Sequence, residues 1–142
     1  MVGLVLVSHV DLGLSLRRAA EMLIGPQERL ATVGLGADTE PATLRRELEA
    51  AFEAVAHPRG VLVLADLYGG SPEATSVEVA GRARMPVEVV AGANLPMLLA
   101  ALSLRSSMPL SALASHVRKA GRDGVVRVPV AGHWPPAAPG PR

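Results

Sequence analysis

Short apolar runs that alternate with helix-length segments are the feature that most constrains the fold of this chain. The runs are rich in Val and Leu, which is typical of β-strands. They cover residues 2–7, 29–35, 60–65, 86–91 and 124–130. The first, third and fourth runs are apolar almost throughout, and this pattern indicates strands of a parallel sheet whose two faces are both covered by helices.

The segments between the runs carry helical patterns. Apolar residues recur there at three- and four-residue steps, and capping residues, prolines and glycines mark the ends. Thr39, Ser71 and Asn94 are the expected N-caps of the second, third and fourth helices. Gly121 is the expected end of the fifth helix. The expected helices cover residues 12–24, 41–55, 71–84, 95–105 and 110–120.

This βα alternation predicts an α/β fold with an open, mainly parallel sheet and helices on both faces. With 142 residues, of which 49% are hydrophobic, the chain suits one domain with one core. We place this domain at residues 1–131. Residues 132–142 are rich in Pro and Ala, and we expect them to form a flexible tail.

Composition excludes several classes of function. A formal net charge of +1 and an aromatic content of 2% argue against a nucleic-acid partner, which needs a basic surface and stacking side chains. The absence of cysteine excludes disulfides, thiolate metal sites and a cysteine nucleophile. No metal or dinucleotide motif is present, so we expect no metal and no cofactor. The first apolar run is too short for a signal peptide, and no run approaches the ~18 apolar residues of a membrane span, so we expect a soluble, cytoplasmic protein.

Residues directly after the first and third runs are the candidates for chemistry, because ligands of open parallel sheets bind beyond the carboxyl ends of the strands. His9 follows the first run and Asp66 follows the third. In the flavodoxin-like strand order these two strands are neighbours, which brings the imidazole and the carboxylate within hydrogen-bonding reach. A carboxylate on one ring nitrogen leaves the other nitrogen unprotonated, so His9 is a candidate nucleophile. The alternative is an inert surface histidine.

A diglycine turn precedes the third expected helix. Gly69 and Gly70 allow the backbone to approach an anion closely, and the helix start offers unpaired N–H groups that suit a phosphoryl group. The Ser71 hydroxyl could cap the helix, bind a phosphoryl oxygen, or do both. The alternative is that the glycines serve only a tight turn between strand and helix.

Taken together, these motifs resemble the enzyme IIA domain of the mannose family of the bacterial phosphoenolpyruvate:sugar phosphotransferase system. The resemblance runs from residue 1 to about residue 130 and rests on five blocks in the order of the family. The blocks are residues 5–9, 20–28, 66–72, 92–98 and 121–124.

The resemblance implies a phosphohistidine carrier and its partners. His9 would accept a phosphoryl group from the carrier protein HPr and pass it to a IIB component, for sugar uptake and phosphorylation. Asp66 would be the acidic companion of that histidine, and Gly69, Gly70 and Ser71 would hold the phosphoryl oxygens. The resemblance also implies a homodimer in which the last strand, residues 124–130, is exchanged and pairs antiparallel with the partner's sheet. Contact with the membrane would occur only through the transporter complex.

Three residues depart from the pattern of the family: Val10, Glu73 and Ala74, the last standing where the family usually has Asn. Val10 stands where the family usually has Gly, and a β-branched residue disfavours positive φ, so we expect the turn after His9 to differ in detail. Glu73 stands where the family usually has Phe. Its charge suits the start of a helix but repels a phosphoryl group or an acidic partner.

Two rival functions use the same residues. A receiver-like module would be phosphorylated on Asp66, but the chain lacks the acidic pair after the first strand that would hold magnesium, and Lys119, its one lysine, lies in a helix. A regulatory sensor of phosphorylation state would use His9 and bind a partner without feeding a transporter. Onward transfer of phosphate separates the sensor from the carrier.

Overall fold

The computed structural model describes residues 1–131, so the expected tail at residues 132–142 and its His133 lie outside the described residues. Strands and helices alternate along the chain until the last two elements, which are both helices. None of the helices within residues 1–131 is long and apolar enough to cross a membrane. The elements are β1 (Gly3–His9), α1 (Leu12–Ile24), β2 (Leu30–Leu35), α2 (Pro41–Val55), β3 (Val61–Ala65), α3 (Ser71–Ala80), β4 (Val87–Ala91), α4 (Leu95–Leu104) and α5 (Leu110–Asp123).

The four strands form one parallel sheet in the order β2-β1-β3-β4. For these strands the α/β class and the flavodoxin-like order are confirmed. The register pairs Val7 with Ala65 and Ala65 with Ala91, so β1, β3 and β4 approach their carboxyl ends at the same edge of the sheet. The residues that follow β1 and β3 are therefore neighbours in space.

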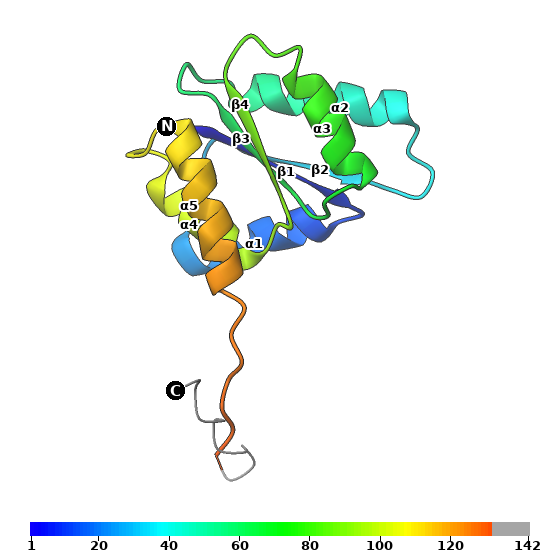
Figure 1. Ribbon diagram of the computed structural model, residues 1–142. Helices are drawn as coiled ribbons and strands as arrows, with labels where there is room; N and C mark the ends of the chain where they lie inside the picture. Colours follow the sequence, from blue (N-terminus) through cyan, green and yellow to red (C-terminus); the bar gives the residue numbers. More distant parts are fainter. Residues whose placement is uncertain (132–142) are drawn as a thin grey trace, which may run out of the picture.

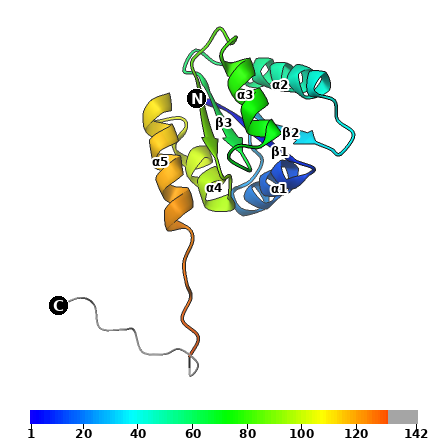
Figure 2. The same ribbon diagram turned by 45° about the vertical axis from the view of Figure 1, so that its right-hand side comes forward.

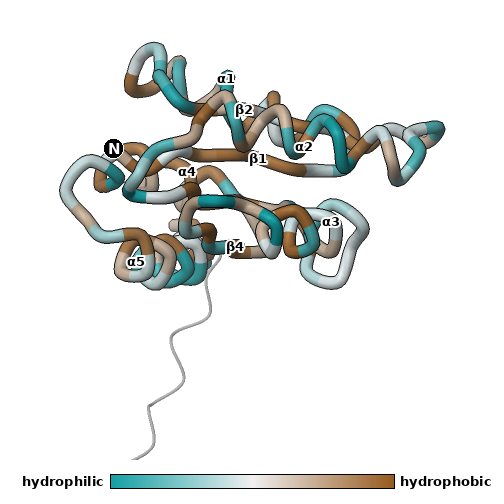
Figure 3. The backbone as a smooth tube through the Cα atoms, turned by 90° about the horizontal axis from the view of Figure 1, so that it is seen from above, coloured by the Kyte–Doolittle hydropathy of each residue, from teal (hydrophilic) through white to brown (hydrophobic). Residues whose placement is uncertain are grey.

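Helices cover both faces of the sheet, with α2 and α3 on one face and α1, α4 and α5 on the other (Figures 1 and 2). Successive side chains of β1 point to opposite faces of the sheet and so contribute to a hydrophobic core on each face. Leu4 and Leu6 belong to the cluster packed against α4 and α5, while Val5 and Val7 belong to the cluster packed against α2. Figure 3 shows β1 as a largely hydrophobic stretch, while the helices around it carry both hydrophobic and hydrophilic residues.

Two residues predicted to mark helix ends have other roles, although α2 spans Pro41–Val55 as predicted. Thr39 does not cap α2: its hydroxyl accepts a hydrogen bond from the Gly36 amide (2.9 Å), and the cap position falls on Glu40. Gly121 does not end α5, which continues to Asp123. A Cβ at Gly121 would lie 2.4 Å from Cγ of Met97, so the glycine allows α5 to pack closely on α4.

The other helix ends either agree with the prediction or fall earlier in the chain than predicted. The N-cap prediction for Asn94 is confirmed, because its Oδ1 accepts a hydrogen bond from the Met97 amide (3.0 Å). The third helix ends at Ala80 instead of residue 84, and the Gly81 amide donates to the Val77 carbonyl at this end. The fourth helix ends one residue earlier than predicted, with Arg105 at the cap position.

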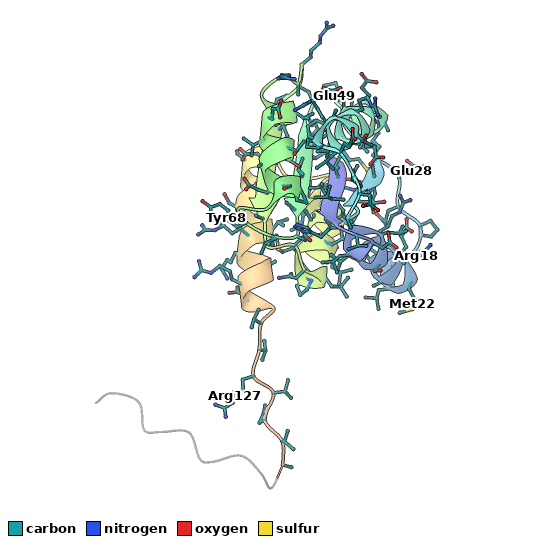
Figure 4. All side chains as sticks on the ribbon, turned by 90° about the vertical axis from the view of Figure 1, so that its right-hand side faces the viewer. Arg18, Met22, Glu28, Glu49, Tyr68 and Arg127 are labelled. Carbon is teal, nitrogen blue, oxygen red and sulfur yellow. The ribbon has the colours of Figure 1, made fainter. Side chains whose placement is uncertain are left out.

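The predicted strand at residues 124–130 is not formed within the described chain. Residues 125–130 have no regular structure and run away from the sheet after α5, as Figures 1 and 4 show. A strand requires a ladder of hydrogen bonds with a neighbour, and this segment lies beside none of the four strands. The valines of this segment are exposed: Val125, Val126, Val128 and Val130. Antiparallel pairing with a second copy stays a prediction.

Replacing Gly3 with alanine tests how tightly β1 packs against the end of α2. A Cβ at Gly3 would lie 2.2 Å from the backbone carbonyl oxygen of Val55, which cannot rotate away. We expect Gly3→Ala to lower the free energy of unfolding by about 2 kcal/mol, measured by urea denaturation. The control is Gly81→Ala, because Gly81 has helical dihedral angles and a Cβ there meets its nearest atom at an ordinary 3.5 Å. Equal stabilities of the two variants would contradict this packing.

Candidate functional site

His9 ends β1 at the carboxyl edge of the sheet, and the alternation of the strand decides which way it points. Ser8 points toward α1, where its Oγ accepts a hydrogen bond from the Gly13 amide (2.8 Å). His9 points to the opposite face, toward the start of α3. There its Cε1 lies 3.1 Å from the position that a Cβ on Gly70 would take. The imidazole therefore borders the diglycine turn.

Asp66 holds His9 through two hydrogen bonds to one oxygen. Oδ2 accepts from the backbone amide of His9 at 2.9 Å and from ring atom Nδ1 at 3.0 Å. The two side chains thus meet, as the strand order predicts. The Asp66 side chain is 8% exposed and the His9 side chain is 44% exposed. When Nδ1 carries the proton of a neutral ring, Nε2 holds a lone pair and can act as a nucleophile.

The second oxygen of Asp66 is buried and has no hydrogen-bond partner among residues 1–131. Burying a carboxylate without full hydrogen bonding is costly, and a positive charge nearby offsets that cost. Among residues 1–131, His9 is the hydrogen-bond partner of this carboxylate.

The turn before α3 differs from prediction in its cap. Gly70 occupies the N-cap position and Ser71 is the first helical residue, so Ser71 does not cap the helix. Its side chain is exposed, and its hydroxyl makes no hydrogen bond within the described chain, which leaves the hydroxyl available to a ligand. Gly69 has a φ of +78°, which requires glycine even though no atom crowds its Cβ position. Both the turn and the anion-binding interpretations of the glycines are compatible with this geometry.

Glu73 makes a contact that sequence reasoning missed. Its Oε2 accepts a hydrogen bond from the Gly69 amide at 3.1 Å. One amide of the diglycine turn is therefore already bound to a carboxylate of the chain. The four-residue separation between Gly69 and Glu73 was the signal in the sequence that could have found this contact.

Val10 corrects the expectation that a β-branched residue would avoid positive φ. Its φ is +48°, and its amide donates to the Leu35 carbonyl at 2.8 Å. The buried Oγ of Ser8 also holds this turn. It accepts a hydrogen bond from the Gly13 amide and donates one to the Val10 carbonyl (3.4 Å). These bonds impose the strained conformation, which costs on the order of 1–3 kcal/mol. Ser8 is thus an anchor of the turn.

The remaining described histidines lie elsewhere. His57 is at the opposite edge of the sheet, where its Nε2 lies 3.5 Å from the N-terminal ammonium of Met1. Burial and, next, the charge of that ammonium lower the pKa of His57. His116 is exposed on α5. Within residues 1–131 no three acidic or histidine side chains are grouped so that they could hold a metal ion.

Exposed apolar side chains lie in the segments that follow β1 and β3, close to His9 and Asp66 along the chain. Figure 4 shows Tyr68 projecting outward from the loop after β3. Apolar side chains gathered around a polar group are typical of a surface that docks another protein. The exposed residues are Val10, Leu12, Leu67 and Tyr68, which we call the apolar rim.

Comparisons of the sequence and of the fold with known proteins identify relatives of this chain. The family described as PTS system fructose IIA component (EIIA-man) matches residues 3–118. Over 119 residues the chain is 29% identical to the PTS system fructose-specific EIIA component of Bacillus subtilis (strain 168), covering 83% of this chain and 80% of that protein. Over 126 residues it is 33% identical to the PTS system mannose-specific EIIAB component of Escherichia coli (strain K12).

The E. coli match covers 87% of this chain but 38% of the relative's length. Among solved structures, the mannose/sorbose specific IIA subunit of the phosphotransferase system from Enterococcus faecalis matches with a TM-score of 0.81. The two are 27% identical, and the match covers 91% of this chain and 96% of that chain.

Replacing Val10 with glycine tests the strain in the turn. Glycine adopts positive φ without a Cβ clash, so we expect Val10→Gly to raise the free energy of unfolding by about 1 kcal/mol, in urea denaturation. Val10 is 65% exposed, so little burial is lost. Val10→Ala keeps the Cβ and should gain less than the glycine variant. A glycine variant less stable than the wild type would show that the turn is not strained.

Proposed function

The chain belongs to the EIIA-man family of phosphotransferase-system IIA components, and on this premise we propose that it carries a phosphoryl group on His9, accepting it from phospho-HPr and passing it to a IIB component. The family supports a role in sugar phosphotransfer. The observation that carries the assignment to His9 is the bond from Nδ1 to Asp66, since it leaves Nε2 as the nucleophilic atom on a side chain that is 44% exposed.

In the proposed step, the lone pair of His9 Nε2 attacks the phosphorus of phospho-HPr. A P–N bond forms to Nε2 while the P–N bond to the donor imidazole breaks, and the donor ring keeps the electron pair of that bond. Nδ1 of His9 retains its proton throughout, so the product ring is a phosphorylated imidazolium. Phosphoryl transfer of this kind needs in-line placement and charge stabilisation more than covalent help.

Asp66 stabilises the phosphorylated ring in this scheme. Its Oδ2 lies 3.0 Å from Nδ1, so the carboxylate faces the positive charge that develops on transfer. The hydrogen bond from the His9 amide to the same oxygen fixes the carboxylate before the donor arrives. A preorganised charge of this type requires no rearrangement at the moment of reaction.

The diglycine turn and the start of α3 supply donors for the phosphoryl oxygens. Gly70 borders the ring at Cε1, the carbon next to Nε2, so a phosphoryl group on Nε2 would lie beside this turn. The exposed Ser71 hydroxyl and the partial positive charge of the helix start suit its negative charge. The scheme uses no metal ion.

Surface features support the proposed partners. The exposed apolar rim supports docking of HPr and of the IIB component around His9, one after the other. The alternating exposed valines of residues 125–130 support the exchange of this segment between two copies, where it would gain the ladder that it lacks in one chain.

Phosphorylation on Asp66 is less well supported than phosphorylation on His9. The Asp66 side chain is 8% exposed, and one of its oxygens is bound twice by His9. A buried carboxylate held in this way is a poor nucleophile toward a second protein. The Asp66 contacts therefore favour the carrier over a receiver-like module.

Replacing His9 with alanine tests the acceptor. With enzyme I, HPr and radiolabelled phosphoenolpyruvate, we expect His9→Ala to take up no label, because it lacks the nitrogen that forms the P–N bond. The control is His116→Ala, which should label like the wild type since His116 lies on the surface of α5. The phosphate of the wild type should be acid-labile and base-stable. Normal labelling of His9→Ala would refute the assignment.

Onward transfer separates the carrier from the regulatory sensor. Labelled wild-type protein mixed with IIB proteins of the mannose family should lose its label to one of them. A stable label in the presence of every IIB protein encoded beside this chain would favour the sensor.

Replacing Asp66 with asparagine tests the companion carboxylate. The variant keeps the shape but loses the charge that faces the imidazolium, so we expect phosphoryl transfer to slow by roughly 10- to 100-fold without stopping. Rapid-quench measurement of labelling from phospho-HPr would provide the rate. Asp123→Asn, at the end of α5, should transfer at the wild-type rate. An unchanged rate in Asp66→Asn would make this carboxylate a purely structural group.

A further inference from the structure

Glu73 places a negative charge in the same turn that would receive the phosphoryl group. Its Oε2 binds the Gly69 amide at 3.1 Å, and Glu73 lies in the first turn of α3. No Lys, Arg or His side chain of the described chain forms an ion pair with Glu73. Its charge is therefore balanced by the turn amide and by the positive end of the helix, the same groups that suit a phosphoryl group.

The Glu73 carboxylate and a phosphoryl group on His9 would compete, because both would lie beside the same turn. Gly70, directly after Gly69, borders the His9 ring, since a Cβ at Gly70 would lie 3.1 Å from Cε1 of His9. A phosphoryl group on Nε2 brings about two negative charges at neutral pH to this turn. Either the Glu73 carboxylate releases the Gly69 amide, or it stays and repels the phosphoryl oxygens, and both outcomes raise the free energy of the phosphorylated state. The contact is exposed, so the side chain is free to rotate into solvent.

We propose that Glu73 is an internal anion that competes with the phosphoryl group of His9 for the Gly69 amide and so shifts the transfer equilibrium away from this protein and toward its partners. The proposal rests on the proposed phosphorylation of His9. The phosphorylated protein is then a stronger donor to the next component, and it accepts less phosphate from HPr at equilibrium, than it would with a neutral residue at position 73.

The first test measures the equilibrium of phosphoryl exchange with HPr. We expect Glu73→Gln, which keeps the side-chain shape, to raise the equilibrium constant for phosphorylation by phospho-HPr about two- to fivefold at low salt. The gain should shrink in 1 M NaCl, where exposed charges are screened within about 3 Å. The matched control is Glu49→Gln, which removes one charge from the exposed side of α2 and should match the wild type (Figure 4). An equilibrium constant that is unchanged or lowered in Glu73→Gln overturns the proposal.

The second test does not depend on HPr. Potassium phosphoramidate phosphorylates histidine without a protein donor. The chemical shift of the Gly69 amide is measured by nuclear magnetic resonance before and after this phosphorylation. In the wild type we expect this amide to shift on phosphorylation as it exchanges the carboxylate for the phosphoryl group. In Glu73→Gln we expect the amide of the unmodified protein to differ already from that of the wild type.

The proposal is overturned if the resonance of the Gly69 amide is the same in the wild type and in Glu73→Gln and does not shift on phosphorylation. If HPr labels neither protein while phosphoramidate produces the expected shifts, the proposed carrier function fails but the competition at Gly69 stands. The two failures are thus distinguishable.

Discussion

One oxygen atom, Oδ2 of Asp66, connects the two strand ends on which the site depends. It accepts from the amide and from Nδ1 of His9, so a single carboxylate orients both the backbone and the ring. This geometry exists because β1 and β3 are adjacent parallel strands that reach the same edge in register, with Val7 opposite Ala65. Both faces of the sheet are buried against helices, and this keeps that register fixed, since a slip by one residue would turn every side chain of a strand toward the core on the opposite face.

The loop that follows His9 shows how the core supports local strain. Val10 adopts positive φ although it is β-branched, because its amide bonds β2 and Ser8 bonds both its carbonyl and the start of α1. Gly34 on β2 leaves room for this turn, as a Cβ there would lie 2.4 Å from the Val10 carbonyl oxygen. The strain is thus localised beside the reactive ring, and the surrounding hydrogen bonds and packing maintain it.

In the proposed carrier, the charges at the site favour passing the phosphoryl group on over retaining it. The start of α3 and the exposed Ser71 hydroxyl attract an anion, while Asp66 attracts the cationic ring. Glu73 adds an opposing charge in the same turn. A site with strong attraction alone would hold a phosphoryl group too tightly for transfer, because the acceptor must offer a lower free energy for the same group. In the proposed scheme, the exposed apolar rim supports the approach of a partner protein to His9.

The sequence by itself determined the order of the first nine elements, because apolar periodicity is encoded locally. The strand order and the meeting of His9 with Asp66 were expected by analogy with flavodoxin-like sheets, and they depend on how the strands pair in the folded chain. It identified Asn94 as a cap but misassigned Thr39, Ser71 and Gly121, whose roles depend on neighbours that approach only after folding. Tertiary structure alone decided the positive φ of Val10, the anchoring role of Ser8 and the contact of Glu73 with Gly69. Residues 125–130 form no strand in the structure, because a strand needs hydrogen bonds to a neighbouring strand and the single chain provides none for this segment.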